Sequence, residues 1–339
     1  MMLSQLAGVK TDSDHQEVNM DDEKQNQPIL LVDAMNLFCR SFAAYPSMTT
    51  SGEQIGGAVG FLKTLKRVVS DIRPRRIYVC WESGGSARRR GIYHDYKAQR
   101  RPEKLNRFYE DDIPESEENR AKQIAILTRL MRLLPVCQVY VSDCEGDDII
   151  AYLCRHTFKD ADKVIMSSDK DLYQLLDEKT RIYSLHKKVY LDLDVVQDEF
   201  RIHAKNFALA KAICGDQSDN VPGIKGLGFK TLVKRFPFFG DSSELMIDDV
   251  VAFSHTHIKE SSVYKNLIEN VDVVKRNWQL VYLGDIALAP NQMEKIDHIV
   301  GTFAPSANKI EFIRRLIAEG IQGFDVNDFF FAFLCVSYA

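Results

Sequence analysis

The sequence lacks any long hydrophobic run and any cysteine pattern that would mark a scaffold. Its longest uncharged apolar stretch, from Phe329 to the C-terminus, has 11 residues, which is too short to span a bilayer, and the polar first residues lack a signal-peptide core. The seven cysteines are odd in number and include no Cys-x-x-Cys pair, so a disulfide framework and a structural zinc site are both disfavoured. These absences predict a soluble cytoplasmic protein.

An overall excess of positive charge is also missing. The formal net charge is −4, but residues 1–27 contain six acids and two lysines and account for all of it. Between Arg88 and Arg107 there are eight basic residues and only two acids, and residues 110–118 then hold six acids. Charge is therefore segregated along the chain, which leaves nucleic acid as a partner. Residues 1–27 are polar and are predicted to form a disordered acidic tail.

What the sequence does contain, from Ile29 onward, is a repeating pattern of short apolar runs, carboxylates and amphipathic stretches. The runs expected to be buried strands are Ile29–Val32, Ile77–Trp81, Gln138–Val141 and Val164–Met166. The stretches expected to be helices are Gly57–Ser70, about Glu118–Leu134, and Asp147–His156. This alternation predicts an α/β fold with a parallel sheet and helices on both faces. After about residue 200 strands are expected to stop, and helical patterns dominate.

Each predicted strand is followed by acidic residues. These are Asp33, Glu82, Glu145, Asp147, Asp148, Asp169 and Asp171. The carboxyl ends of parallel strands line one crevice, where so many like charges would repel one another strongly. Hard divalent cations with oxygen ligands would compensate, so Mg²⁺ or Mn²⁺ is indicated. Acids favoured at helix N-termini explain any one of these residues equally well, but they do not explain the whole set.

A second acidic pair, Asp216 and Asp219, precedes a glycine-rich turn. The turn contains Gly223, Lys225, Gly226, Gly228 and Lys230. Its pattern predicts a helix, a hairpin and a second helix, in which backbone N–H groups approach a phosphate without a Cβ in the way. The glycines alone would indicate only a turn, but together with the acidic pair they are specific. Carboxylates for two cations beside phosphate-binding elements suggest two-metal phosphodiester hydrolysis.

The basic stretch interleaves its cations with Tyr93, Tyr96 and Phe108. Basic side chains neutralise phosphates and aromatic rings stack on unpaired bases, so this stretch is expected to bind a single strand. The competing interpretation is a solvated helix face.

The acidic motifs resemble those of a known family. They are Leu30-Leu31-Val32-Asp33, Tyr93-x-x-Tyr96-Lys97, Glu145-Gly146-Asp147-Asp148, Ser168-Asp169-Lys170-Asp171 and Gly215-Asp216-x-x-Asp219-Asn220. In this order they are similar to the structure-specific 5′-nuclease family, which includes bacteriophage 5′–3′ exonucleases (flap endonucleases) and the 5′-nuclease domain of bacterial DNA polymerase I. The similarity covers about residues 29 to 240, and no polymerase domain is expected to follow.

The resemblance implies a PIN-like nuclease domain over residues 28–200, a helical arch at about 88–122, and a helix-hairpin-helix subdomain over 201–290. Residues 291–339 have no assigned role. Two Mg²⁺ ions are implied, with Mn²⁺ as a substitute, and often a K⁺ at the hairpin. Residues implied for the first metal are Asp33, Glu82, Glu145 and Asp147, supported by Asp148. Those implied for the second are Asp169, Asp171, Asp216 and Asp219. The family usually has Asp at the position of Glu82.

Catalytic roles are implied for Lys97 and Arg100 at the scissile phosphate and for Tyr93, which would stack near the cut. DNA contacts are implied for Arg89 and Arg90, beside Tyr96 and the hairpin residues. The activity implied is 5′–3′ exonuclease and 5′-flap endonuclease action on flaps, nicks or RNA primers during replication. The protein is expected to be a monomer in the cytoplasm (the host's, if phage-encoded), meeting partners such as a single-strand-binding protein. A PIN-type ribonuclease and a non-catalytic junction binder are the alternatives; the first would have fewer acids and no glycine hairpin, and the second would lack some acids.

Overall fold

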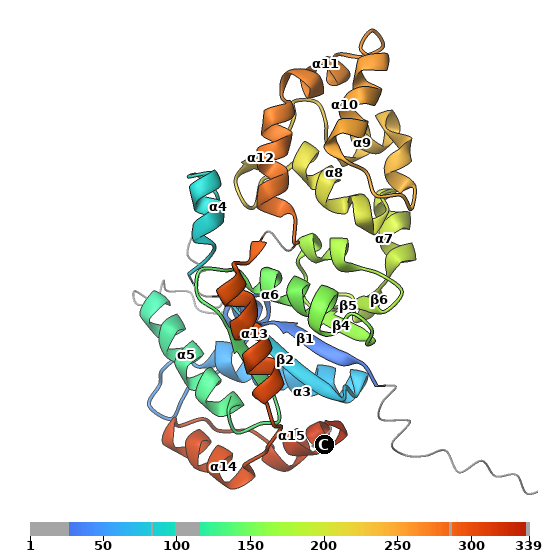
Figure 1. Cartoon of the computed structure of the whole chain (residues 1–339). Coiled ribbons are helices and arrows are strands. Elements are labelled where there is room, and N and C mark those ends of the chain that lie inside the picture. Colours follow the sequence, from blue (N-terminus) through green and yellow to red (C-terminus); the bar gives the residue numbers. More distant parts are fainter. Residues whose placement is uncertain (1–26, 83, 99–115, 285–286, 337–339) are drawn as a thin grey trace, which may run out of the picture.

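The fold is built around one six-stranded sheet (Figure 1). The computed structural model describes residues 27–82, 84–98, 116–284 and 287–336. The strands are β1 (Ile29–Asp33), β2 (Arg76–Trp81), β3 (Cys137–Tyr140), β4 (Lys163–Met166), β5 (Thr180–Ser184) and β6 (Val189–Leu191). Their order is β3-β2-β1-β4-β5-β6, and all neighbours are parallel except β6, which is antiparallel to β5. The predicted α/β class with a parallel sheet is confirmed.

Alternation along β1 shows how the sheet separates two hydrophobic cores. Ile29 and Leu31 point into one core, whereas Leu30 and Val32 point into the other. Side chains of successive strand residues point to opposite faces, so a strand buried on both sides is apolar throughout. This is why the strand was readable from the sequence as a continuous apolar run.

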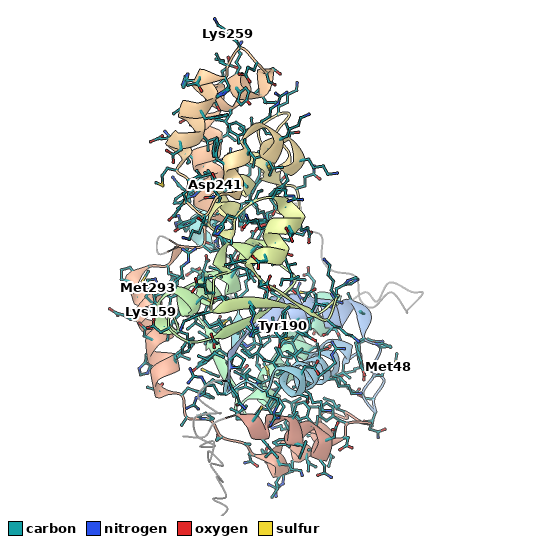
Figure 2. All side chains as sticks on the ribbon, turned by 90° about the vertical axis from the view of Figure 1, so that its right-hand side faces the viewer. Met48, Lys159, Tyr190, Asp241, Lys259 and Met293 are labelled. Carbon is teal, nitrogen blue, oxygen red and sulfur yellow. The ribbon has the colours of Figure 1, made fainter. Side chains whose placement is uncertain are left out.

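Helices cover both faces of the sheet and continue beyond it. Their bounds are α2 (Ala34–Ala44), α3 (Gly56–Ile72), α4 (Ala87–Ile92), α5 (Ser116–Met131), α6 (Gly146–Tyr152), α7 (Leu193–Phe200), α8 (Phe207–Cys214), α9 (Phe229–Arg235), α10 (Ile247–Thr256), α11 (Ser262–Glu269), α12 (Val271–Val281), α13 (Pro290–Thr302), α14 (Lys309–Ala318) and α15 (Val326–Phe331). Helices α2, α3 and α5 share one core with α14 and α15. Helix α6 shares the other with α8 to α12, which rise above the carboxyl ends of the strands towards a tip near Lys259 (Figures 1 and 2).

The four predicted strands and three predicted helices are present, but two strands escaped the sequence analysis. Strand β5 includes the exposed Arg181, and only Leu191 of β6 is buried. Because β6 is an edge strand of only three residues, it is too short to give a strand pattern in the sequence. The expectation that strands stop near residue 200 misses the short antiparallel pair β7 (Gly215–Asp216) and β8 (Val221–Pro222). The predicted acidic tail (apart from Gln27) and the middle of the predicted arch lie outside the described residues.

The C-terminal segment, which had no assigned role, packs against the sheet domain. Helix α13 lies against β3, and α14 and α15 close the second core (Figure 1). The ring of Phe312 stacks on that of Phe329 with centroids 5.4 Å apart, and both residues are buried. Phe331, by contrast, is 73% exposed.

Replacing Phe312 by Ala should lower the free energy of unfolding by about 3–5 kcal/mol, because it empties a fully buried aromatic site. Ile310 lies on the same helix but is 66% exposed. Ile310→Ala should therefore stay within about 0.5 kcal/mol of the parent protein. Urea unfolding measures both variants. Equal midpoints for the two would show that α14 is not part of the core.

Candidate active site

The acids predicted at the strand ends do gather at the carboxyl edge of the sheet. Asp33 is the last residue of β1, and Glu82 directly follows β2. Glu145 precedes α6, and Asp169 precedes the 3-10 turn Lys170–Leu175 that follows β4. Strands β1 and β4 are neighbours, but the chain leaves them in opposite directions along the sheet. Such a switch point is where open α/β sheets bind ligands.

Asp33 lies at this switch point in an environment that resists its ionisation. Ser167 Oγ donates to Asp33 Oδ2 over 2.9 Å, and the Asn36 N–H donates to Oδ1 over 3.0 Å. Burial raises the pKa of Asp33 to about 6, and the charges of Asp169 and Glu82 raise it further against the effect of the two hydrogen bonds. The three carboxylates therefore act on one another across the sheet edge.

Glu82 faces the same space as Glu145. Gly84 and Gly85 have φ values of 71° and 73°, so this turn uses the left-handed region that glycine adopts without strain. A Cβ at Gly85 would lie 3.6 Å from Glu82 Oε1 and 3.9 Å from Glu145 Oε1. The longer arm of Glu82, compared with the usual Asp, therefore reaches towards the Glu145 carboxylate.

Glu145 is buried and uses only one of its two oxygens within the protein. Its Oε2 accepts from Lys97 Nζ over 2.6 Å and from Tyr96 Oη over 3.1 Å. Burial opposes ionisation, but the charges of Lys97 and Arg89 hold the pKa of Glu145 below its usual value. Its Oε1 is buried with no hydrogen-bond partner among the described residues. An ionised, buried carboxylate oxygen without a partner is what a cation site requires.

Arg89 occupies a different place from the one expected of a DNA contact. It is 1% exposed, and its guanidinium donates to both oxygens of Asp148 over 2.7 and 2.6 Å. Its Nε donates to the Leu280 carbonyl over 2.7 Å, which joins α4 to the end of α12. Asp148 also accepts from the Glu145 N–H over 3.1 Å. This buried pair fixes the start of α6, so Arg89 positions the carboxylates from inside the protein rather than guiding a strand at the surface.

Asp147 is the sequence neighbour of Asp148 but takes no part in the ion pair between Arg89 and Asp148. It is half-buried in the first turn of α6. Burial raises the pKa of Asp147 well above its usual value, and the charge of Asp148 raises it further. Of these adjacent acids, Asp148 is thus paired with an internal cation, whereas Asp147 is in an environment that opposes its ionisation.

A second acidic cluster forms where helices α8 to α12, which we call the helical unit, meet the sheet. One carboxylate oxygen each from Asp171, Asp216 and Asp219 lie within 4.8 Å of one another. Lys211 on α8 contacts Asp171 Oδ1, and its Nζ donates to Asp216 Oδ2 over 2.6 Å. Burial raises the pKa of Asp216, but the charge of Lys211 and the hydrogen bonds from Lys211 and Ser218 outweigh it and lower the pKa to about 2. This arrangement keeps Asp216 ionised.

Lys211 was not identified from the sequence. The available signal was its position inside Phe207–Cys214, an otherwise apolar helix in which a lysine needs a buried acidic partner.

Tyr96 and Lys97 bridge this second cluster and the first cluster, which is formed by the acids at the ends of β1 and β2 and at the start of α6. Lys97 Nζ lies 4.0 Å from Asp219 Oδ2 as well as 2.6 Å from Glu145 Oε2. Its backbone has a φ of 56°, and its N–H donates to the Asp219 carbonyl over 2.9 Å. Tyr96 was expected at the DNA surface but is 6% exposed, and its hydroxyl lies 3.1 Å from Glu145 and 3.5 Å from Asp219. The strained backbone therefore directs Lys97 between the carboxylates, while Tyr96 fills the space beneath it.

The glycine-rich hairpin between α8 and α9 has a packed base and an exposed tip. A Cβ at Gly223 would lie 2.0 Å from the Cys214 carbonyl oxygen, so this glycine is required for packing rather than for access. At the tip, Lys225, Gly226, Gly228 and Lys230 are exposed. Asn277 of α12 secures the base by donating to the carbonyls of Ala212 and Pro222 over 2.9 and 2.8 Å.

The remaining predicted residues lie around α4. Arg276 covers the ring of Tyr93 at 4.4 Å from its centroid, so one face of that ring is already occupied. Arg90 is exposed and donates to the Gly84 carbonyl over 2.9 Å. Arg100 lies outside the described residues.

An α/β sheet whose carboxyl edge collects two acidic clusters defines a class of protein, the hydrolases that act on phosphodiesters with bound cations. The family model described as 5′-3′ exonuclease, N-terminal resolvase-like domain, matches residues 28–201. A 5′-3′ exonuclease of Bacillus subtilis is 32% identical over 219 residues, which cover 62% of this chain and 69% of that protein. The chain belongs to the 5′-3′ exonuclease family, and the predicted enzyme class, phosphodiester hydrolase, is confirmed.

Other comparisons agree with this membership. The thermostable DNA polymerase I of Thermus aquaticus is 30% identical over 255 residues, 74% of this chain but only 28% of that protein. The T5 D15 protein, co-crystallised with metal ions, has a TM-score of 0.63 at 19% identity and covers 81% of this chain and 98% of its own. The catalytic core of Rad2 in complex with DNA substrate has a TM-score of 0.52 at 16% identity, and the match covers 90% of this chain and 92% of the Rad2 chain. These two structures show the fold. No helix among the described residues is long and apolar enough to cross a membrane.

Asp147 and Asp148 should respond in opposite ways to the same substitution. Asp148→Asn should cost about 3 kcal/mol or more of stability, because it leaves the buried Arg89 without its charge partner. Asp147→Asn should cost nothing or stabilise the metal-free protein, because it removes repulsion from a neighbour. Urea unfolding in EDTA compares them. A greater loss for Asp147→Asn would contradict the assignment of the internal pair.

Proposed function

We propose that the chain is a divalent-metal-dependent DNA 5′-nuclease that cuts 5′ flaps near the junction of single strand and duplex and degrades nicked or RNA-primed ends from the 5′ side. Its products carry a 5′-phosphate and a 3′-hydroxyl, and the implied role is removal of RNA primers or flaps in replication. The observation that carries the proposal is the position of Lys97, whose Nζ lies 2.6 Å from Glu145 Oε2 and 4.0 Å from Asp219 Oδ2 and so bridges the two groups of carboxylates. It rests on the family membership and on the chemistry of these side chains.

The donors present suit two Mg²⁺ ions, with Mn²⁺ as a substitute, because all are oxygens and one, Glu145 Oε1, is buried and has no hydrogen-bond partner in the part of the chain that the structure describes. The first ion would be held by Asp33, Glu82, Glu145 and Asp147. The second would be held by Asp169, Asp171, Asp216 and Asp219. When bound, such ions lower the pKa of a water molecule and stabilise charge on the attacking and leaving oxygens.

The chain's own cations have separate tasks in this proposal. Lys97 points into the space between the clusters, where its ammonium would pair with the scissile phosphate. Lys211 and Arg89 are turned inward and hold carboxylates in place through buried ion pairs. Arg90 would contact the incoming 5′ strand, and the free face of Tyr93 would stack near the cut. Arg100 would join Lys97 at the scissile phosphate.

Duplex binding is assigned to the hairpin tip. Lys225 and Lys230 are exposed there, beside Gly226 and Gly228, and would bind phosphates of the double-stranded part, with K⁺ as an additional ion at this turn. The hairpin lies next to the second acidic cluster through α8, so a bound duplex would place its strand end at the carboxylates. We expect a monomer to suffice and a single-strand-binding protein to be the partner that meets it on displaced strands.

The alternatives stay less well supported. A PIN-type ribonuclease does not account for the glycine hairpin secured by Asn277. A non-catalytic junction binder would have a degenerate acidic set, whereas every acid expected for the second site is present in this sequence and three of them lie within 4.8 Å of one another.

The direct test is cleavage of a 5′-labelled flap duplex and of a matched intact single strand, with Mg²⁺ and with EDTA. The proposal expects a cut at the junction that requires Mg²⁺ and is restored by Mn²⁺ after chelation. The single strand should be cut far more slowly. Tight binding of the flap without cleavage in either metal would instead support the junction binder.

Lys97 and Lys230 should separate chemistry from binding. Lys97→Ala should lower the single-turnover rate at saturating enzyme by about 10²–10³-fold, because it removes a charge that stabilises the reacting phosphate. Lys230→Ala should leave that rate within about twofold and raise the dissociation constant for duplex DNA by about 2–5-fold, because it removes one phosphate contact. Comparable losses of rate in both variants would contradict the division of roles.

A further inference from the structure

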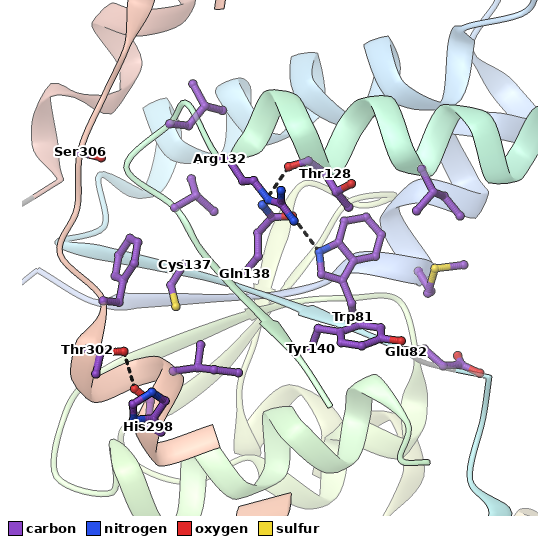
Figure 3. A pocket seen from close by; sticks show the side chains of 16 residues that line it. Trp81, Glu82, Thr128, Arg132, Cys137, Gln138, Tyr140, His298, Thr302 and Ser306 are labelled. Atoms are coloured by element: carbon purple, nitrogen blue, oxygen red, sulfur yellow. Dashed lines mark hydrogen bonds between the residues drawn. The ribbon is translucent and has the colours of Figure 1, made fainter. Parts of the chain in front are cut away.

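A large cavity lies outside the acidic clusters, along the free edge of the sheet. Strand β3 is the edge strand, and no other described strand pairs with its outer side. Between α5 and α13, this edge forms a groove of about 820 Å³, which we call the β3 groove (Figure 3). Pockets of about 300–1,000 Å³ hold small organic ligands, so the β3 groove has room for a short segment of a polymer.

The lining of the β3 groove combines flat apolar surface with an arginine and a histidine. Trp81 is held in place by the ring of Phe61, 6.1 Å away and nearly parallel, and its Nε1 donates to Gln138 Oε1 over 3.2 Å. Arg132, which directly follows α5, and His298 of α13 line opposite sides (Figure 3). Both are exposed, and no side-chain ion pair or hydrogen bond is found for either within the described residues. The Arg132 guanidinium is a cation and the His298 ring can donate a hydrogen bond, so both side chains favour an anionic occupant.

Tyr140 adds an accessible aromatic ring at the end of the groove near Glu82 (Figure 3). It is 50% exposed, although it belongs to a strand of a packed sheet. Lys295 Nζ lies 5.6 Å from the centroid of its ring. An exposed ring beside cations is the combination that binds unpaired nucleotides, because bases stack on the ring while phosphates meet the charges.

The β3 groove is continuous with the candidate active site. Glu82 belongs to both, since it lines the groove and faces Glu145 across Gly85. Along the carboxyl edge of the sheet the second acidic cluster lies beyond β4, the first lies between β1 and β3, and the groove follows at β3. A strand whose duplex part rests on the hairpin would cross the carboxylates in this order and arrive at the β3 groove.

We propose that the β3 groove binds the single-stranded nucleotides on the 5′ side of the cut, which stack on Tyr140 and pair through their phosphates with Arg132 and His298. The inference rests on the proposed function and adds a binding site to it. The competing occupant is an extended peptide that pairs with the free edge of β3. Arg132, His298 and the continuity with Glu82 favour nucleic acid.

The test uses the full chain with Tyr140→Ala combined with Arg132→Ala, and two substrates: a nicked duplex without a flap and the same duplex with a long unstructured flap. The KM for the long flap should rise by about tenfold, while the KM for the nick and both kcat values stay unchanged. Equal effects on the two substrates, or none, would overturn the proposal.

The matched control lies at the opposite edge of the same sheet. Tyr190 of β6 is 38% exposed and has Arg181 over its ring at 4.9 Å (Figure 2). Tyr190→Ala should change neither KM. Circular dichroism confirms that each variant is folded.

A binding measurement in EDTA separates this inference from the proposed function. Fluorescence anisotropy of a labelled single strand should show weaker binding for Tyr140→Ala with Arg132→Ala than for Tyr190→Ala, whether or not the parent protein cleaves DNA. If the parent cleaves neither substrate but this difference appears, the proposed function fails and the groove stands. Unchanged binding, with loss of binding to an extended acidic peptide, would assign the groove to protein partners.

Discussion

Repulsion among carboxylates is the constraint on which the rest of this structure depends. Seven of the nine acids predicted for two cation sites follow strands of one parallel sheet, and the helical unit brings two more. The protein meets part of this charge internally, through Arg89 on Asp148 and Lys211 on Asp171 and Asp216. These ion pairs do not compensate all of it. The pKa of Asp33 is raised to about 6, and Oε1 of Glu145 is buried without a hydrogen-bond partner among the described residues. Binding of metal ions would relieve the remaining repulsion among these carboxylates.

The same constraint explains how distant segments are joined. Arg89 lies on α4 and reaches both α6 and the end of α12, while Lys97 takes a left-handed backbone to stand between Glu145 and Asp219. Lys211 ties the helical unit to the turn after β4. Each of these three basic side chains thus has two effects: it pairs with an acidic side chain, and it connects two parts of the molecule. The helices that bear the hairpin are held in register with the sheet edge by these contacts.

The sequence predicted the sheet and the acids because their signals are local. A strand buried on both faces is apolar throughout, as Ile29–Asp33 is, and the acid that follows it is visible by position alone. Strand β5 was missed because its exposed Arg181 interrupts the apolar run, and β6 was missed because it is a three-residue strand at the edge of the sheet. The inward roles of Arg89, Tyr96 and Lys211 were missed because burial and partners far along the chain decide them. Phe329 and Phe331 differ in the same way: one is buried and the other is 73% exposed, which adjacent letters do not reveal.

The central claim is that two cations act together at the two clusters. The most direct measurement is the single-turnover rate of flap cleavage as a function of Mg²⁺ concentration, well below saturation. The account predicts that the logarithm of the rate rises with the logarithm of concentration with a slope near two. It also predicts a slope near one for Asp216→Asn at concentrations that fill the first site. A slope of one for the parent protein, or cleavage that survives EDTA, would contradict it.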